Sequence, residues 1–228
     1  MKVFFKKALE KELAAHILFF NNKPACNICI PIKYPDKTFK DTFALRGWYA
    51  FKENEYLFPH SNFIFVEYYY GDSENYRLLG IDMINKIPLK ACLIKHKQLF
   101  EEVLGPPFSL EEFMAKLEEG QSLSSLLKGN HILLGIVLGY GEESSRAFNS
   151  VITQHTGIIP PPHTETYQVI DLNVPNGCKI NPVVFMGNPN SEEVKQLIST
   201  YEQELDEAWN VYKRSKDPLK IALESLCK

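Results

Sequence analysis

Four predicted helices in the middle of the chain each end at a glycine, and this regular punctuation constrains the fold more than any other feature of the sequence. The first helix, predicted over residues 91–104, ends at Gly105, and two prolines that cannot continue a helix come next. The next three end at Gly120, Gly129 and Gly139. Glycine readily adopts the left-handed backbone that ends many helices. The sequence therefore predicts a run of short helices across this region.

The starts of these helices carry matching signals. Ser109 and Glu112 have the spacing of a capping box, in which the hydroxyl accepts from a backbone N–H three residues on. Asn130 is a natural N-cap for the apolar segment that follows it, and Glu142 and Glu143 lie in the favourable first turn of the next helix. Start and stop signals thus predict the same helices.

The apolar segment Ile132–Leu138 has a second interpretation. If it were a strand, Gly139 and Gly141 would form a glycine turn before a helix, which is the order of a dinucleotide-binding unit. Asp171 ends a later predicted strand, as the ribose-binding acid should. A nucleotide-binding domain is therefore one of the alternative functions.

Three observations count against that alternative. Ser144 stands at the third glycine position, and the acidic residue follows after about 30 residues rather than ~20. Glu142 and Glu143 would place two negative charges where a pyrophosphate binds. A like charge at ~4 Å costs about 1 kcal/mol even in water. The helical interpretation of this stretch is the stronger one.

The first third of the chain carries the strand signals. Alternating isoleucines predict a strand over 27–33, with Pro31 indicating a sheet edge. Alternation of Phe43, Leu45, Gly47, Tyr49 and Phe51 predicts a second strand over 43–51. Residues 63–70 and 76–83, separated by a polar turn over 71–75, predict a β-hairpin.

Helices and a proline-rich connector complete the chain. Apolar residues at three- and four-residue steps predict a helix over 3–20, and the longest helix begins near Asn190 and Glu193. Asp217 caps a final short helix. Residues 157–163, with three consecutive prolines, are the best candidate for a sub-boundary. Short strands are predicted after it over 167–172 and 180–186. We predict one α+β domain over residues 1–228. Its small antiparallel sheet combines strands of the first third with those after Pro162, and it is packed by short glycine-terminated helices and a long C-terminal helix.

Composition excludes several classes of protein. The 228 residues include 45% hydrophobic residues and carry a net charge of -3, as expected for a soluble globular protein without the basic surface of a nucleic-acid binder. No apolar run approaches the ~20 residues that span a bilayer. We predict no nucleic-acid partner, no transmembrane segment and a cytoplasmic location by default, with export after removal of a leader left open.

The five cysteines are an odd number, which favours reduced thiols. Cys26 and Cys29 have the spacing of a redox pair or half a zinc site, but residues three apart on a strand point to opposite faces. Cys92 and His96, four apart on a predicted helix, are remote in sequence from that pair. The sequence predicts no metal site and no cofactor.

Two groups of residues are candidates for binding or catalysis. Tyr68, Tyr69 and Tyr70, with Trp48 nearby, could line a partner surface, although strand alternation would place half of them in the core. The second group surrounds the Gly139–Gly141 turn and could form a hydrolase-type site there. Its members are His131, Tyr140, Glu142, Glu143 and Arg146.

Two stretches of the sequence resemble segments of a known group of proteins. Leu133–Phe148 reads LLGIVLGYGEESSRAF, and Phe185–Leu223 reads FMGNPNSEEVKQLISTYEQELDEAWNVYKRSKDPLKIAL. Both are similar to segments of a group of bacterial proteins of unassigned function. The resemblance implies a bacterial origin but no activity, so no functional residue is carried over from it.

No nucleophile, base or metal constellation can be assembled from the sequence. The leading hypothesis is therefore a non-catalytic binding or interaction protein, whose partner is an unknown protein or small molecule. A hydrolase-type enzyme with its site near residues 139–146 is the alternative, and a nucleotide-binding domain is the second alternative.

Overall fold

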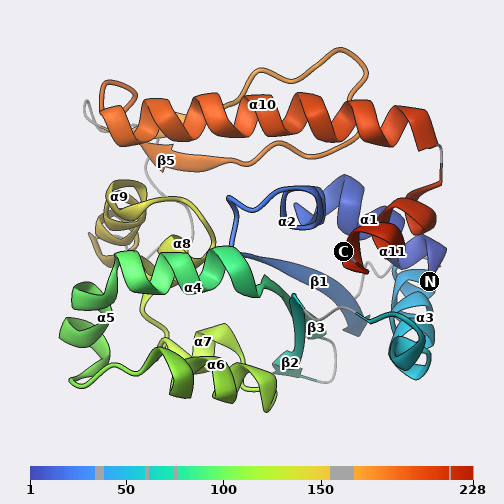
Figure 1. The fold of residues 1–228 in the computed structure, drawn as a ribbon, viewed down its shortest axis with the longest axis horizontal. Coiled ribbons are helices and arrows are strands. Elements are labelled where there is room, and N and C mark those ends of the chain that lie inside the picture. Colours follow the sequence, from blue (N-terminus) through green and yellow to red (C-terminus); the bar gives the residue numbers. More distant parts are fainter. Residues whose placement is uncertain (34–38, 60–61, 74–75, 155–166, 216, 228) are drawn as a thin grey trace.

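The computed structural model describes residues 1–33, 39–59, 62–73, 76–154, 167–215 and 217–227. Over these residues the chain has an α+β fold, as the sequence predicts (Figure 1). A three-stranded antiparallel sheet lies between two groups of helices, and a long helix, α10 (Glu192–Ser215), runs along one side of the molecule. None of the described helices is long and apolar enough to cross a membrane.

The central sheet has the strand order β1-β3-β2, in which β1 is Ala25–Lys33, β2 is Phe63–Ser73 and β3 is Tyr76–Asn85. The predicted hairpin is confirmed, because β2 pairs with β3 in antiparallel register, and β1 lies at an edge. The predicted turn over 34–37 and part of the hairpin turn lie outside the described residues.

The strand predicted over 43–51 is wrong, because this segment belongs to helix α3 (Phe39–Glu53). Ala44, Trp48 and Phe51 are buried on one side of the helix, at spacings of four and three residues. Trp48 packs against Phe65 of β2 with ring centroids 5.6 Å apart, so a helical face covers the sheet where sequence alternation indicated another strand.

The predicted N-terminal helix is two helices, α1 (Lys2–Lys11) and α2 (Ala14–Phe19). The break lies at Leu13, whose φ of 63° is left-handed and cannot continue a right-handed helix. Helices α1, α2 and α3 cover one face of the sheet together with α11 (Pro218–Leu226), in a core that includes Phe4, Phe5 and Trp48.

The glycine-terminated helices cover the opposite face of the sheet. Gly105, Gly120 and Gly139 have positive φ where their helices end, so these three predicted glycine stops are confirmed. The stop predicted at Gly129 comes early, because the helix ends at Leu126 and Lys128, with φ 51°, is the first left-handed residue after it. The helix predicted over 91–104 is wrong in its limits, because the chain breaks at His96 into two helices. The bounds are α4 (Lys86–Lys95), α5 (Lys97–Leu104), α6 (Leu110–Glu118), α7 (Leu123–Leu126) and α8 (His131–Val137).

The capping predictions are also confirmed. The Ser109 hydroxyl accepts from the N–H of Glu112 at 3.1 Å, and the Asn130 side chain accepts from the N–H of Leu133 at 3.0 Å. Asp217 caps α11. Because residues 131–137 are a helix, the strand, glycine turn and helix order of a dinucleotide-binding unit is not present here.

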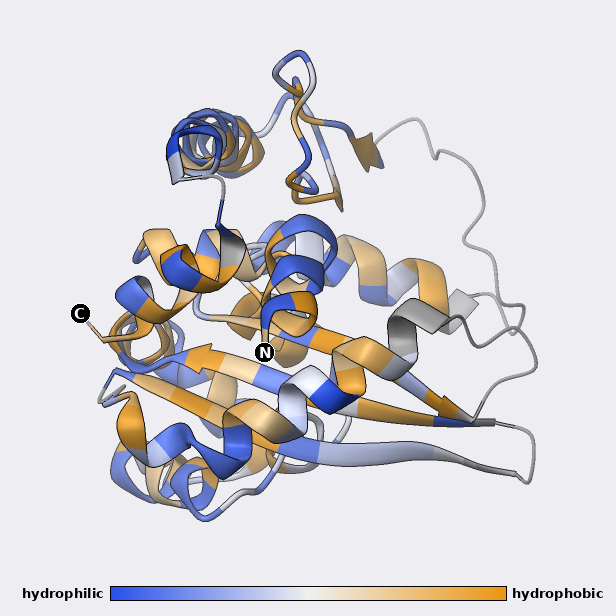
Figure 2. Ribbon diagram, turned by 90° about the vertical axis from the view of Figure 1, so that its right-hand side faces the viewer, coloured by the Kyte–Doolittle hydropathy of each residue, from blue (hydrophilic) through white to orange (hydrophobic). Residues whose placement is uncertain are grey.

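Helix α9 (Glu142–Gln154) leads to the predicted proline-rich connector over 157–163, which lies outside the described residues. Beyond it, β4 (Gln168–Ile170) and β5 (Phe185–Gly187) form a separate two-stranded sheet instead of joining the first. Viewed end-on in Figure 2, α10 turns its hydrophobic side toward the segment that carries these strands. One turn of 3-10 helix, Glu55–Leu57, follows α3.

Candidate functional site

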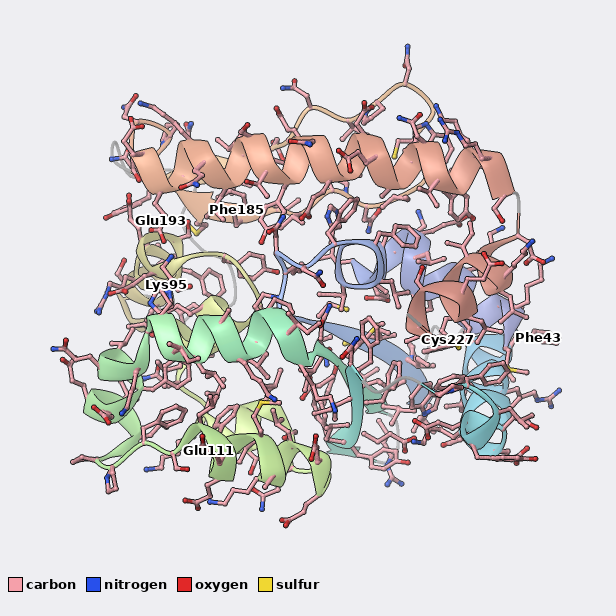
Figure 3. The ribbon with its side chains drawn as sticks, viewed as in Figure 1. Phe43, Lys95, Glu111, Phe185, Glu193 and Cys227 are labelled. Carbon is pink, nitrogen blue, oxygen red and sulfur yellow. The ribbon has the colours of Figure 1, made fainter. Side chains whose placement is uncertain are left out.

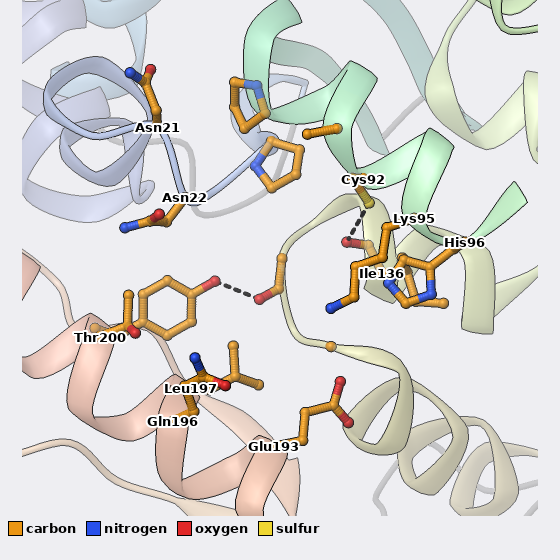
Figure 4. A pocket seen from close by; sticks show the side chains of 16 residues that line it. Asn21, Asn22, Cys92, Lys95, His96, Ile136, Glu193, Gln196, Leu197 and Thr200 are labelled. Atoms are coloured by element: carbon orange, nitrogen blue, oxygen red, sulfur yellow. Dashed lines mark hydrogen bonds between the residues drawn. The ribbon is translucent and has the colours of Figure 1, made fainter.

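A polar cleft of about 340 Å³ lies where α4, the α8–α9 turn and α10 meet (Figure 4). The end of the α2 segment closes a further side. The volume falls within the ~300–1,000 Å³ that small-molecule sites occupy. The polar lining residues are Asn21, Asn22, Cys92, Lys95, His96, Glu193, Gln196, Thr200 and Tyr201.

Helical periodicity places these side chains on facing surfaces. Cys92 and His96 are four residues apart on α4 and its boundary, so both face the cleft. On α10, Glu193, Gln196 and Thr200 follow one another at steps of three and four residues and face the cleft from the other side.

The α8–α9 turn approaches α10 closely, and two glycines make this approach possible. Gly139 has φ 83°, and a Cβ there would lie 2.7 Å from the Tyr201 hydroxyl oxygen, which itself donates to the Gly139 carbonyl. Gly141 has φ 78°, and a Cβ there would lie 2.6 Å from Glu193 Oε1. Any larger residue at either position would push the turn away from α10.

Glu193 caps helix α9 from outside it. Its Oε1 accepts from the N–H of Glu142 and its Oε2 from the N–H of Glu143, both at 2.9 Å. A carboxylate is favoured at this position because the first N–H groups of a helix have no internal partner and carry partial positive charge. The place where a pyrophosphate would bind is therefore occupied by the chain's own side chain.

His96 and Arg146 both contact Glu142 at the edge of the cleft. His96 Nδ1 lies 3.2 Å from Glu142 Oε2, and Arg146 Nη2 lies 2.8 Å from Glu142 Oε1. Hydrogen bonds from Arg146 and then from His96 hold the pKa of the Glu142 carboxyl below its usual range. A hydrogen bond from Nδ1–H would leave Nε2 of the neutral imidazole as an acceptor.

Cys92 is not activated by this pair. Its thiol donates to the carbonyl of Ile136 at 3.6 Å, and burial raises the pKa of Cys92 to about 11. The thiolate is the nucleophilic form of cysteine, so Cys92 carries almost none of it near neutral pH. Among the residues that the structure describes, no three His, Cys, Asp or Glu side chains are placed to hold a metal ion.

The Lys95 ammonium is the charged group of the cleft that can contact a ligand. Its side chain reaches from α4 toward α10, with Glu193 on the opposite side (Figure 4). The described part of the chain offers Lys95 no carboxylate at ion-pair distance, and Gln196 and Thr200 make no side-chain hydrogen bond there. A cation and two uncharged polar groups thus remain free to contact a ligand.

Beneath the turn lies a fully buried lysine, Lys23. Its ammonium donates to the Leu138 carbonyl and lies 4.5 Å from the centroid of the Tyr140 ring and 5.8 Å from that of Tyr201. Burial lowers the pKa of Lys23 to about 8, against smaller raising effects of Cys26 and Glu204. Lys23 thus holds the α8–α9 turn in place through its contacts with Leu138 and Tyr140.

The five candidates around the turn do not converge on one site. Glu142 and Arg146 form an ion pair, while Glu143 contacts the Ser191 hydroxyl. His131 and Tyr140 line a separate apolar pocket on the other side of the turn. Sequence reasoning missed Lys95, His96, Glu193, Gln196 and Thr200 as residues of one cleft. The spacing of Cys92 and His96 on one helix was the available signal.

The aromatic candidates are mostly packed. Trp48 is fully buried and donates to Glu67 at 2.6 Å, and the rings of Tyr68 and Tyr70 lie over Gly80. Tyr69 is the exposed member of the group.

All five cysteines are unpaired. Cys26 packs into the core on one face of the sheet, while Cys29 bonds to Asn27 and Tyr70. The two thiols therefore do not converge, as strand geometry predicts.

The chain matches no protein family, no curated protein and no solved structure. The resemblance of residues 133–148 and 185–223 to a bacterial group therefore stays a prediction. The function has to be inferred from the geometry of the cleft.

Proposed function

We propose that the protein is a non-catalytic binding protein that takes a small polar molecule with an anionic group in the cleft between α4, the α8–α9 turn and α10. The observation that carries this proposal is the Lys95 ammonium, which faces a cleft of about 340 Å³ without a carboxylate partner in the described residues. An anionic group on the ligand would supply that partner.

The chemistry of the other lining groups supports a small polar ligand. Gln196 can donate and accept, and Thr200 can do the same through its hydroxyl. Glu193 is held against two backbone N–H groups, which partly neutralise its charge and reduce its repulsion of an anion. Polar groups from α4 and α10 would then contact the same molecule from two sides.

A hydrolase is the second candidate, and the contact between His96 and Glu142 favours it. An imidazole oriented by a carboxylate is the usual arrangement of a general base. The pair lies beside the cleft, but Cys92 is held as a thiol, so water would have to be the nucleophile. If this function is correct, chromogenic carboxylic or phosphate esters are hydrolysed and His96→Gln abolishes the reaction. A nucleotide-binding domain has less support, because Glu193 caps α9.

A bacterial origin and a cytoplasmic location are also proposed. The five unpaired cysteines support a reducing compartment, and the two sequence stretches described above support the origin.

A thermal-shift experiment with matched lysine variants tests the proposed binding. The panel consists of inorganic phosphate, acetate, succinate, glutamate and, as an uncharged control, glucose. A ligand present at ~100 times its Kd stabilises a protein by about 2.7 kcal/mol. Lys95→Gln should remove the shift caused by the anionic ligand. Lys90→Gln, a change at an exposed residue of the same helix that does not line the cleft, should keep it.

The proposal is wrong if no anion in the panel stabilises the wild type. It is also wrong if the Lys95→Gln variant responds to the same ligand as strongly as the wild type does. Equal loss in both lysine variants would indicate general surface electrostatics and would likewise contradict it.

A further inference from the structure

A second pocket, of about 330 Å³, lies on the other side of the α8–α9 turn. It is bounded by α8, α9 and the β4–β5 sheet, and Figure 3 shows Phe185 of that sheet between α9 and α10. Its lining is His131, Leu134, Gly135, Leu138, Tyr140, Ser144, Ser145, Phe148, Val169, Val184, Phe185 and Met186.

The chemistry of this second pocket is opposite to that of the cleft. No Asp, Glu, Lys or Arg is among its described lining residues, and most of its wall is aliphatic or aromatic. The rings of Tyr140 and Phe185 stack, with centroids 6.5 Å apart and planes at 20°. A charged ligand would lose its hydration here without gaining a partner.

The wall also contains the polar residues His131, Tyr140, Ser145 and Ser144, of which Ser144 is the most buried. The residue is 1% exposed, and its hydroxyl oxygen has no hydrogen-bond partner among the described residues. Buried hydroxyl groups in folded proteins almost always have a partner, so an unpartnered one requires an explanation. The Ser144 hydroxyl oxygen lies against β5, where a Cβ added to Gly187 would be 3.2 Å away, so the hydroxyl is covered by the chain itself.

The mouth of the second pocket is also apolar. Phe148 is 41% exposed, Val169 45% and Val184 48%. Large apolar side chains that gather at the rim of a hollow mark a binding surface more often than scattered ones do. The rim and the interior of the pocket thus both favour an apolar molecule.

We propose that this second pocket binds an uncharged, largely apolar small molecule, which its apolar lining and its exposed apolar rim both favour. A dry apolar cavity of ~150 Å³ binds benzene, so about 330 Å³ corresponds to a molecule of roughly twice that size. The ligand differs in class from that of the polar cleft, and the two sites are separated by the α8–α9 turn.

The test uses N-phenyl-1-naphthylamine, a neutral aromatic probe whose fluorescence rises in apolar surroundings. The wild type should bind it saturably. Val184→Asp, which places a carboxylate at the mouth, should weaken binding at least about tenfold. Val174→Asp is the matched control, because Val174 is 49% exposed, lies in the same β4–β5 connection and does not line the pocket.

The outcomes separate this inference from the proposed function. Lys95→Gln should leave probe binding unchanged, so loss of anion binding in the cleft does not affect the result. Absence of saturable probe binding to the wild type would overturn the inference. Equal binding by the two valine variants, whether both are weakened or both intact, would overturn it as well.

Discussion

Lys23 gives the sharpest energetic prediction, because its ammonium is fully buried and the described residues provide no carboxylate at ion-pair distance. Its partners are a carbonyl and two aromatic rings. Burial lowers the pKa of Lys23 from 10.5 to about 8. Lys23→Met keeps a side chain of similar length and removes the titrating group.

The direction in which stability changes with pH follows from the number of protons bound to the folded and the unfolded protein. Between about pH 8 and pH 10.5 the unfolded chain keeps the proton on Lys23 while the folded protein releases it, so stability rises with pH through this window. The lowering of the pKa from 10.5 to about 8 corresponds to about 3 kcal/mol in total. About 2 kcal/mol of this should be recovered between pH 7 and roughly pH 9.5.

The assay is urea unfolding of wild type and Lys23→Met at a series of pH values. The free energy of unfolding of the wild type, minus that of the variant, should rise by about 2 kcal/mol across that interval. Taking the difference cancels groups that titrate alike in both proteins. A difference that stays constant with pH would refute the reasoning, since Lys23 would then have an ordinary pKa in the folded protein.

Three further predictions concern single residues. Gly139→Ala should destabilise the fold by about 2–4 kcal/mol, because it adds a clash with Tyr201 to left-handed strain. Gly177→Ala is the control, because its added Cβ meets open space, and thermal unfolding should show a clearly smaller loss of stability for it. Equal losses of stability in the two variants would exclude the clash with Tyr201. Glu193→Gln should cost about 1 kcal/mol in urea unfolding by weakening the cap of α9, and an unchanged midpoint would contradict this role. Ser144→Ala should stabilise the ligand-free protein by about 1 kcal/mol, whereas a loss of stability would show that the hydroxyl has a partner.

Local chemistry explains which parts of the fold could be predicted. The stops at Gly105, Gly120 and Gly139 and the caps at Ser109 and Asn130 depend on neighbouring residues alone, and all of these hold. Residues 43–51 have apolar side chains at both strand and helix spacing. Only the burial of Trp48 against the sheet decides between the two.

The helix breaks were not predictable from local signals. The breaks lie at Leu13 and His96, which are neither glycine nor proline, so the residue type does not signal them. Tertiary packing determines the backbone conformation at both positions. Elsewhere the apolar segment 132–138 could be read as strand or helix, and the capping signal of Asn130 identified it correctly.

The candidate site was harder to predict than the fold, because its contacts join distant segments. Glu193 reaches Glu142 across 51 residues, and His96 reaches the same residue across 46. The sequence did indicate the neighbourhood of the Gly139–Gly141 turn. It could not show that His131 and Tyr140 lie in one pocket while the free Lys95 faces another.

The most direct test of the polar cleft as the binding site is two-dimensional NMR of backbone amides during titration with the anion that gives the largest thermal shift. The largest chemical-shift changes should lie at Lys95, Gly139, Gly141, Gln196 and Thr200, and they should disappear in Lys95→Gln but persist in Lys90→Gln. Changes centred on another part of the molecule, or the same changes in the Lys95→Gln variant, would contradict the assignment of the ligand to this cleft.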